Sequence, residues 1–143
     1  MTKPDAPDDA TLRRILQAMR VVAVVGASPN PARPSHGVSG YLQAQGYRVI
    51  PVNPGHAGKA LFGERVVARV GDLPPEVDTL DFFRRSDHVA PIVRAGLEHL
   101  PGLKLVWLQL GVVSDEARGM CDARGVAFIQ NRCPRIEIPR LLG

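Results

Sequence analysis

The sequence has few cysteines and no long apolar run. Its two cysteines, Cys121 and Cys133, show neither metal-ligand spacing nor a disulfide framework, which is typical of a protein kept in a reducing compartment. No segment offers the roughly 18 uninterrupted apolar residues that a membrane span needs. The N-terminus is polar and acidic, unlike a secretory signal. We therefore expect a cytoplasmic protein that does not bind a membrane and holds no structural metal.

Aromatic residues are also scarce, with one Trp, two Tyr and four Phe in the chain. Single-stranded nucleic acids bind to repeated aromatic platforms, and such a platform is absent. The formal net charge of +4 favours a polyanionic ligand, but the basic residues are scattered and the longest basic run is Arg84-Arg85. This pattern argues against nucleic acid and leaves a phosphorylated cofactor as the anionic partner.

The chain of 143 residues has the length of one domain with its own core, and its composition is that of an ordinary globular protein. We expect a single domain over residues 1–143, with residues 1–7 flexible. Apolar runs predict strands, and helical spacing of apolar residues behind capping residues predicts helices between them. The expected strands are 21–25, 47–52, 77–83, 104–110 and 126–129, and the expected helices are 8–19, a short one ending at Gly46, one opening at Ser86 and one from Ser114 to about Arg124.

This alternation predicts an α/β fold: a Rossmann-like, doubly wound, mostly parallel five-stranded sheet with helices on both faces. We expect the strand order 3-2-1-4-5, with the loops that begin at Gly26 and Gln109 beside the ligand crevice. Residues 55–71 are the least regular, with a short strand expected at 66–70. Pro134 and Pro139 are expected to limit the C-terminal tail to short pieces.

The turn after the first strand does not carry the dinucleotide fingerprint G-x-G-x-x-G. Gly26 is in place, but Ser28 stands where the second Gly belongs and the next Gly is Gly37. The second strand ends in Asn53-Pro54, whereas an NAD site places an acidic residue there for the ribose. An NAD(P)-binding oxidoreductase-like domain is therefore the alternative hypothesis, not the first.

The longer loop after Gly26 has the features of a phosphate site. Hydroxyl, amide and guanidinium groups, and the backbone N–H groups at the start of the following helix, favour an anion. Three prolines stiffen the loop and lower the entropy lost on binding. The donor side chains are Ser28, Asn30, Arg33 and Ser35.

Five blocks, in order along the chain, resemble the small stand-alone CoA-binding domain proteins, which are related to the CoA-binding domain of the succinyl-CoA synthetase α-subunit. The resemblance implies a Rossmann-like fold that binds coenzyme A at the carboxyl ends of the strands. The blocks are V-V-G-A-S-P-N-P-A-R-P-S-H-G-V at 24–38, V-I-P-V-N-P-G at 49–55, D-F-F-R-R at 81–85, V-W-L-Q-L-G-V at 106–112 and N-R-C-P at 131–134.

The resemblance also implies roles for individual positions. The turn of Gly26, Ala27 and Ser28, together with Arg33, would hold phosphate, and Asn53 with Pro54 would border the nucleotide. An acid after the second strand would repel the 3′-phosphate of CoA, so the neutral Asn53 fits this ligand. The crevice would further be lined by Phe83, Arg84, Gln109, Leu110 and Gly111, and Asn131 and Cys133 would lie toward the CoA arm.

No catalytic residues stand out. The synthetase needs a second domain with a phosphorylated His and a partner subunit, and this sequence shows neither. His36 lies near the expected phosphates, but no acid or hydroxyl at an obvious spacing would make it a base. The sequence thus predicts a CoA- or acyl-CoA-binding protein that is not catalytic by itself; a CoA-dependent enzyme subunit that needs a separate protein partner stays open.

Overall fold

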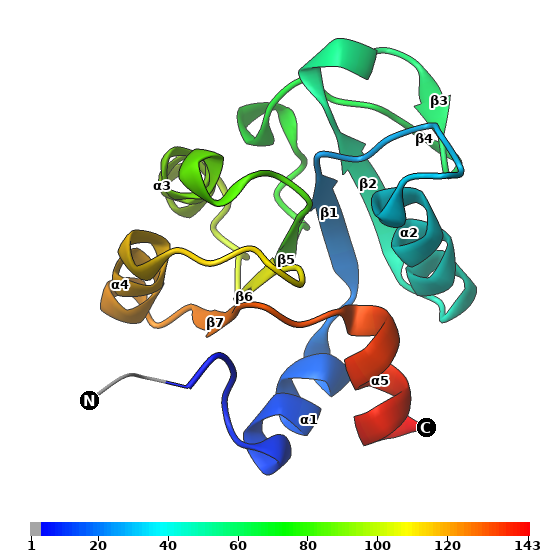
Figure 1. Cartoon of the computed structure of the whole chain (residues 1–143). Coiled ribbons are helices and arrows are strands. Elements are labelled where there is room, and N and C mark those ends of the chain that lie inside the picture. Colours follow the sequence, from blue (N-terminus) through cyan, green and yellow to red (C-terminus); the bar gives the residue numbers. More distant parts are fainter. Residues whose placement is uncertain (1–3) are drawn as a thin grey trace.

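The computed structural model of the chain describes residues 4–143, and it shows the predicted Rossmann-like α/β fold (Figure 1). Five strands form one parallel sheet in the order β2-β1-β5-β6-β7. Their bounds are β1 (Val21–Val25), β2 (Arg48–Val52), β5 (Thr79–Phe82), β6 (Leu105–Leu108) and β7 (Ala127–Ile129).

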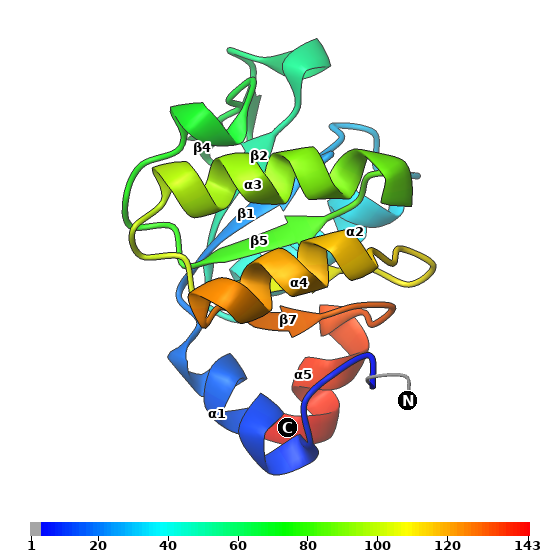
Figure 2. The ribbon, with the colours of Figure 1, turned by 90° about the vertical axis from the view of Figure 1, so that its left-hand side faces the viewer.

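Helices cover both faces of this sheet (Figures 1 and 2). One face carries α3 (Val89–His99) and α4 (Asp115–Arg124), and the other carries α1 (Asp9–Ala18), α2 (Pro34–Ala44) and α5 (Pro134–Leu142). The core is accordingly split into two apolar clusters, one on each side of the strands, which is why the strand sequences are apolar without alternation. None of the described helices combines the length and hydropathy needed to cross a bilayer.

The expected strand order 3-2-1-4-5 is wrong, because the third long strand, β5, pairs with β1 and not with β2. The outer edge of β2 is already occupied by Val67, whose N–H donates to the carbonyl of Pro51 at 3.0 Å and whose carbonyl accepts from Asn53 N at 2.9 Å. The chain therefore returns on the far side of β1. The point where the strand order reverses lies between β1 and β5, so the loops after these two strands flank the crevice.

The segment between β2 and β5 also differs from the expectation. No strand forms at 66–70; a small antiparallel hairpin, β3 (Ala60–Leu61) and β4 (Glu64–Arg65), precedes the Val67 contact. Short 3-10 turns at Pro54–His56 and Val70–Asp72 complete the segment. Buried Val66 and Val70 anchor it to the body, whereas the strands of the hairpin are too short to give a periodic signal.

The C-terminal tail is a continuous helix, α5, although Pro139 lies inside it. Pro134 occupies the first turn, where its missing N–H removes no helical bond. Packing against α1 compensates for the bond lost at Pro139: Arg140 binds Asp9 at 2.9 Å, and Arg13 donates to the carbonyl of Leu141 at 3.0 Å. The prediction of short pieces was wrong because this tertiary contact outweighs the local effect of one proline.

The predicted flexible segment 1–7 lies partly outside the described residues, and its flexibility stays a prediction. Of its described part, Pro4 accepts a hydrogen bond from Arg118 at 2.9 Å, and the carbonyl of Asp5 accepts one from Gln130 N at 2.8 Å. These contacts lay residues 4 and 5 against α4 and the end of β7.

Candidate functional site: a cleft at the carboxyl ends of the strands

A cleft of about 730 Å³ opens at the carboxyl ends of the strands, where the switch point places it. Its walls come from the loop after β1, the start of α2, the ends of β2, β5 and β6, and the residue before α5. The lining residues are Gly26, Ser28, Arg33, Pro34, Ser35, Val38, Asn53, His56, Phe83, Arg84, Arg85, Gln109, Leu110, Val112 and Cys133.

Gly26 lies where the loops after β1 and β5 come close together. Its φ is +90°, and a Cβ at this position would lie 2.9 Å from the carbonyl oxygen of Phe83 and 3.0 Å from Cδ of Arg84. Its N–H donates to the carbonyl of Val52 at 2.9 Å. Glycine is required here because the loops after β1 and β5 approach each other without room for a side chain.

The loop from Ser28 to Arg33 is braced from within. Ser28 N donates to the hydroxyl of Ser35 at 3.2 Å, Asn30 N to the hydroxyl of Ser28 at 3.1 Å, and Ala32 N to the side-chain oxygen of Asn30 at 3.0 Å. Arg33, the N-cap of α2, makes no side-chain capping bond. The start of an 11-residue helix thus faces the cleft beside an exposed guanidinium, which is an arrangement suited to a phosphate.

Asn53 connects the ends of β1 and β2. Its Nδ2 donates to the carbonyl of Ala27 at 2.8 Å, and its Oδ1 accepts from Gly55 N at 2.9 Å. The side chain that replaces the ribose-binding acid of dinucleotide sites is therefore neutral and engaged in holding two loops together.

A second hollow of about 450 Å³ adjoins the cleft, and Arg84 lines both. It lies between the segment after β2 and α3, and its walls are mainly apolar. Pro54, Val70, Ile92 and Ala95 contribute side chains to it. The site therefore combines a polar cradle at α2 with an apolar hollow beyond β2.

At the end of β6 the cleft reaches the buried pair Gln109 and Asp81. Gln109 Nε2 donates to Oδ1 of Asp81 at 2.6 Å. Burial raises the pKa of the Asp81 carboxyl to about 7, and the bond from Gln109 opposes this rise. The pair fixes one orientation of the Gln109 side chain in the cleft wall.

The loop that follows Gln109 is held by side chains of two neighbouring loops. Gly111 N donates to Oδ1 of Asn131 at 2.8 Å, Val113 N to the hydroxyl of Ser86 at 3.0 Å, and Ser114 N to Oε1 of Gln130 at 3.0 Å. Asn131 adopts φ +55°, a conformation that asparagine tolerates better than most residues.

The structure brings most of the predicted site residues together at the cleft. Those that do not line it support the residues that do, or border it: Ala27 is buried beside Gly26, Asn30 braces the first loop, Asn131 holds Gly111 between the lining residues Leu110 and Val112, and Pro54 lines the adjoining hollow. The predicted residues that line the cleft are Gly26, Ser28, Arg33, Ser35, Asn53, Phe83, Arg84, Gln109, Leu110 and Cys133.

Sequence reasoning missed several lining residues, namely Pro34, Val38, His56, Arg85 and Val112. All five follow a predicted residue within one to three positions, so widening each predicted loop would have found them. His56 could have been found from the Asn53-Pro54-Gly55 turn, which carries the chain over the end of β2.

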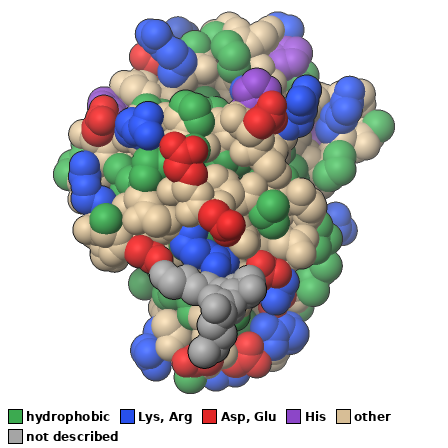
Figure 3. Space-filling model, turned by 60° about the vertical axis from the view of Figure 1, so that its left-hand side comes forward, with side chains coloured by type: hydrophobic (Ala, Val, Ile, Leu, Met, Phe, Trp, Pro, Cys, Tyr) green, Lys and Arg blue, Asp and Glu red, His purple; other side chains and the backbone are tan. Residues whose placement is uncertain are grey.

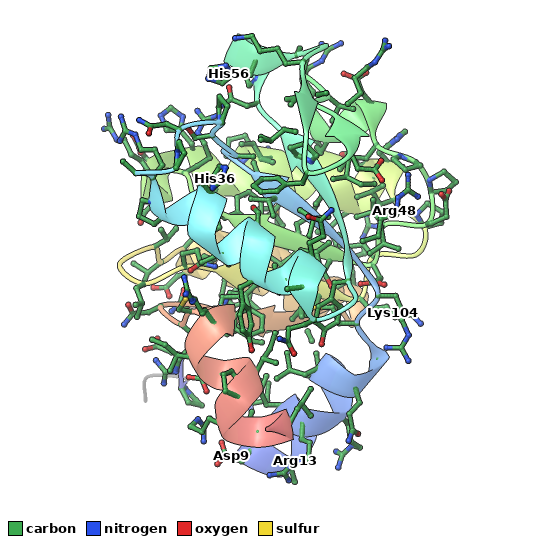
Figure 4. All side chains as sticks on the ribbon, turned by 90° about the vertical axis from the view of Figure 1, so that its right-hand side faces the viewer. Asp9, Arg13, His36, Arg48, His56 and Lys104 are labelled. Atoms are coloured by element: carbon green, nitrogen blue, oxygen red, sulfur yellow. The ribbon has the colours of Figure 1, made fainter. Side chains whose placement is uncertain are left out.

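The histidines near the cleft have contacts that do not resemble a catalytic pair. The ring of His36 lies 5.0 Å from that of Phe62, and Nδ1 of His56 lies 3.2 Å from Nζ of Lys59 (Figure 4). Within residues 4–143, no group of three His, Cys, Asp or Glu side chains is placed to hold a metal ion.

Arg48, a basic residue outside the cleft, is paired with acids. Arg48 binds Glu64 at 3.0 Å and Glu76 at 3.3 Å at the start of β2, away from His36 and His56 (Figure 4). It therefore takes no part in the cleft. On the face shown in Figure 3, acidic and basic side chains are interspersed rather than separated.

The chain is similar to known proteins over most of its length. The model of the CoA-binding domain family matches residues 20–139. The Bacillus subtilis "Uncharacterized protein YneT" is 35% identical over 130 residues, which are 91% of this chain and 93% of that protein.

Two solved structures share the fold over nearly their whole length. Cell-free ID.343 from Thermus thermophilus is 39% identical with a TM-score of 0.88, over 95% of this chain and 100% of that one. A hypothetical protein from Pyrococcus horikoshii OT3 is 35% identical with a TM-score of 0.89, over 100% of this chain and 99% of that one. From the family match and these relatives, we conclude that the chain belongs to the CoA-binding domain family.

Proposed function

We propose that the chain binds coenzyme A in this cleft and is not a catalyst by itself. The observation that carries the proposal is the junction of two hollows of different character at Arg84. CoA has the matching division: a flat adenine, whose faces suit apolar contact, is joined through a ribose and a diphosphate to a long arm. A ligand of this kind fills an apolar hollow and an anion cradle at once.

Each part of CoA has a counterpart in the site. The adenine would lie in the apolar hollow near Pro54, Val70 and Ile92, and the diphosphate at the start of α2 beside Arg33. The arm would follow the cleft toward Leu110 and Cys133. His56, with Lys59 beside it, adds donors near the nucleotide end, where the 3′-phosphate needs them.

NAD(P) fits less well. Where a dinucleotide site has its second glycine, this loop has Ser28, whose hydroxyl accepts a hydrogen bond from Asn30 N. The side chain of Asn53 is already hydrogen-bonded to Ala27 and Gly55. No carboxylate is offered to the ribose at the end of β2.

Isothermal titration calorimetry with CoA, dephospho-CoA and NAD⁺ tests the binding. We expect saturable binding of CoA, weaker binding of dephospho-CoA and no binding of NAD⁺. A thermal shift that grows with CoA concentration is the second readout, since a ligand at about a hundred times its Kd adds about 2.7 kcal/mol of stability. Binding of NAD⁺ with none of CoA would refute the proposal.

The lack of catalysis by the chain alone has its own test. Acetyl-CoA incubated with the protein should be hydrolysed no faster than acetyl-CoA alone. Release of the free thiol measures this rate. Turnover that persists in repeated preparations and is lost in Arg33→Ala would show that the chain is an enzyme. Mass spectrometry of the ligand retained on the native protein identifies the form that is bound in the cell.

A further inference from the structure

Beyond the arm end of the cleft, the structure exposes two large apolar side chains that lie within one short loop. Leu110 is 59% exposed and Val113 is 46% exposed, and Val112 between them lines the cleft. We call these three residues the apolar lip. Two of them, Leu110 and Val112, line the same cleft as Cys133. Exposed apolar groups that adjoin a binding cleft indicate a ligand contact.

The apolar lip is fixed in place. Three backbone N–H groups of this loop donate hydrogen bonds to side chains outside it: Gly111 N to Asn131, Val113 N to Ser86 and Ser114 N to Gln130. A fourth, Val112 N, donates to the carbonyl of Gln109 at 2.9 Å. A loop held by so many bonds cannot turn its apolar side chains inward, so they remain exposed until a ligand covers them.

The orientation of the ligand decides what reaches the lip. The basic pair of His56 and Lys59 and the apolar hollow lie at the β2 side, which suits the nucleotide end of CoA. The thiol end then lies on the side of β6 and α5, against Leu110 and Cys133.

We propose that the cleft takes acyl-CoA with an unbranched apolar acyl chain, and that this chain lies on the apolar lip. The proposal rests on the proposed function and names its ligand class. Two guanidinium groups on this side already face carboxylates: Arg85 binds Asp87 at 3.3 Å, and Arg132 binds Asp5 and Glu137 at 3.6 Å each. An acyl group that ends in a carboxylate would have to lay a charged group on the apolar side chains of the lip, so it should not bind more tightly there.

Calorimetry with CoA, butyryl-CoA, octanoyl-CoA and succinyl-CoA tests this. We expect affinity to rise about two- to fourfold for each methylene that the lip covers, so that octanoyl-CoA binds at least about tenfold more tightly than CoA. Succinyl-CoA should bind no more tightly than CoA. Equal affinity for CoA and octanoyl-CoA would overturn the inference and leave CoA binding intact, whereas failure of all four to bind would refute the proposed function as well.

The double variant Leu110→Ser, Val113→Ser locates the effect. Its ratio of octanoyl-CoA affinity to CoA affinity should fall to near one. A loss of affinity that is common to both ligands does not change this ratio. The matched control is Leu142→Ser, the same change at another exposed leucine, which lies at the far end of α5 and should keep the ratio. An unchanged ratio in the double variant contradicts the inference.

Analytical ultracentrifugation separates this ligand from a second copy of the chain. The inference expects the same mass for the double variant and the unaltered protein at each concentration. A dimer that the double variant dissociates, with the preference for octanoyl-CoA unchanged, would make the lip a protein interface instead.

Discussion

Gln109 Nε2 donates a 2.6 Å hydrogen bond to Oδ1 of Asp81, a carboxyl that is only 1% exposed. Its other oxygen, Oδ2, has no hydrogen-bond partner among the described residues. Asp81 lies between Val24 and Trp107 in the sheet register, so apolar side chains surround it. Burial raises the pKa of this carboxyl to about 7, and its partner Gln109 lines the cleft.

The first prediction concerns stability and pH. Because the pKa of Asp81 is raised on folding, its stabilising effect is complete below the unfolded pKa of 3.8 and is lost as pH rises through about 7. We expect the free energy of unfolding to fall by about 2 kcal/mol from this group between about pH 5 and pH 8. Asp81→Asn, which keeps an acceptor for Gln109, should remove that part of the dependence. Urea unfolding of both proteins at both pH values measures this free energy. An equal fall between the two pH values in both proteins would show that Asp81 is not the source of the pH dependence.

The second prediction concerns the close approach at Gly26. Gly26→Ala combines an unfavourable positive φ with a contact of 2.9 Å to backbone, so both stability and CoA binding should fall, stability by about 2 to 4 kcal/mol. The control is Gly46→Ala, where φ is +97° and nothing lies within 4 Å of the added Cβ. Its free energy of unfolding should fall by only about 1 to 2 kcal/mol, from the strain of alanine at a positive φ, and it should bind CoA like the unaltered protein.

Chemical denaturation and calorimetry on these two variants give the answer. Equal losses of stability and unaltered CoA affinity in both would show that the approach of the β1 and β5 loops does not shape the site.

Much of the fold follows from short-range signals in the sequence. Asp8 accepts from Thr11 N at 2.8 Å and Ser114 from Ala117 N at 3.1 Å, so the helix starts predicted from these capping residues are confirmed. Gly125 ends α4 at φ +69°, as its position after the last apolar residue indicates. Such signals act within a few residues, and one sequence is enough to find them.

What could not be predicted depends on contacts between distant segments. The side of β1 on which β5 pairs is decided by Val67, which occupies the edge of β2, and the helix through Pro139 is decided by contacts with α1. Within the site, loop residues are found from their place after each strand, but the use of Asn131 as a brace for Gly111 is visible only in the fold. Pairing partners of this kind leave no periodic pattern.

The third prediction concerns the phosphate contact of Arg33. Removing an exposed guanidinium beside the start of α2 should weaken CoA binding about tenfold, the usual value of a charge-assisted hydrogen bond. Pantetheine, which lacks the phosphates, should bind Arg33→Ala and the unaltered protein alike. Arg14→Ala removes the same charge from an exposed position on α1 and should change neither affinity.

Calorimetry at two salt concentrations completes this test, since the contribution of Arg33 should shrink as salt screens it. Equal losses for CoA and pantetheine would show that Arg33 acts on the structure of the loop and not on a phosphate.

The last prediction uses the two cysteines as reporters of the cleft. Cys121 is fully buried and burial raises the pKa of its thiol to about 12, so iodoacetamide should not modify it in the folded protein. Cys133 is half-buried and lines the cleft, so it should be modified, and acetyl-CoA, which has no free thiol, should protect it. With acetyl-CoA at about ten times its Kd, modification should slow about tenfold, because only that fraction of sites stays empty. Mass spectrometry of intact Cys133→Ser supplies the control, with no label in the folded protein and one after unfolding. Modification of Cys133 at an unchanged rate under saturating acetyl-CoA would mean that the bound ligand does not extend to the β6 and α5 side of the cleft.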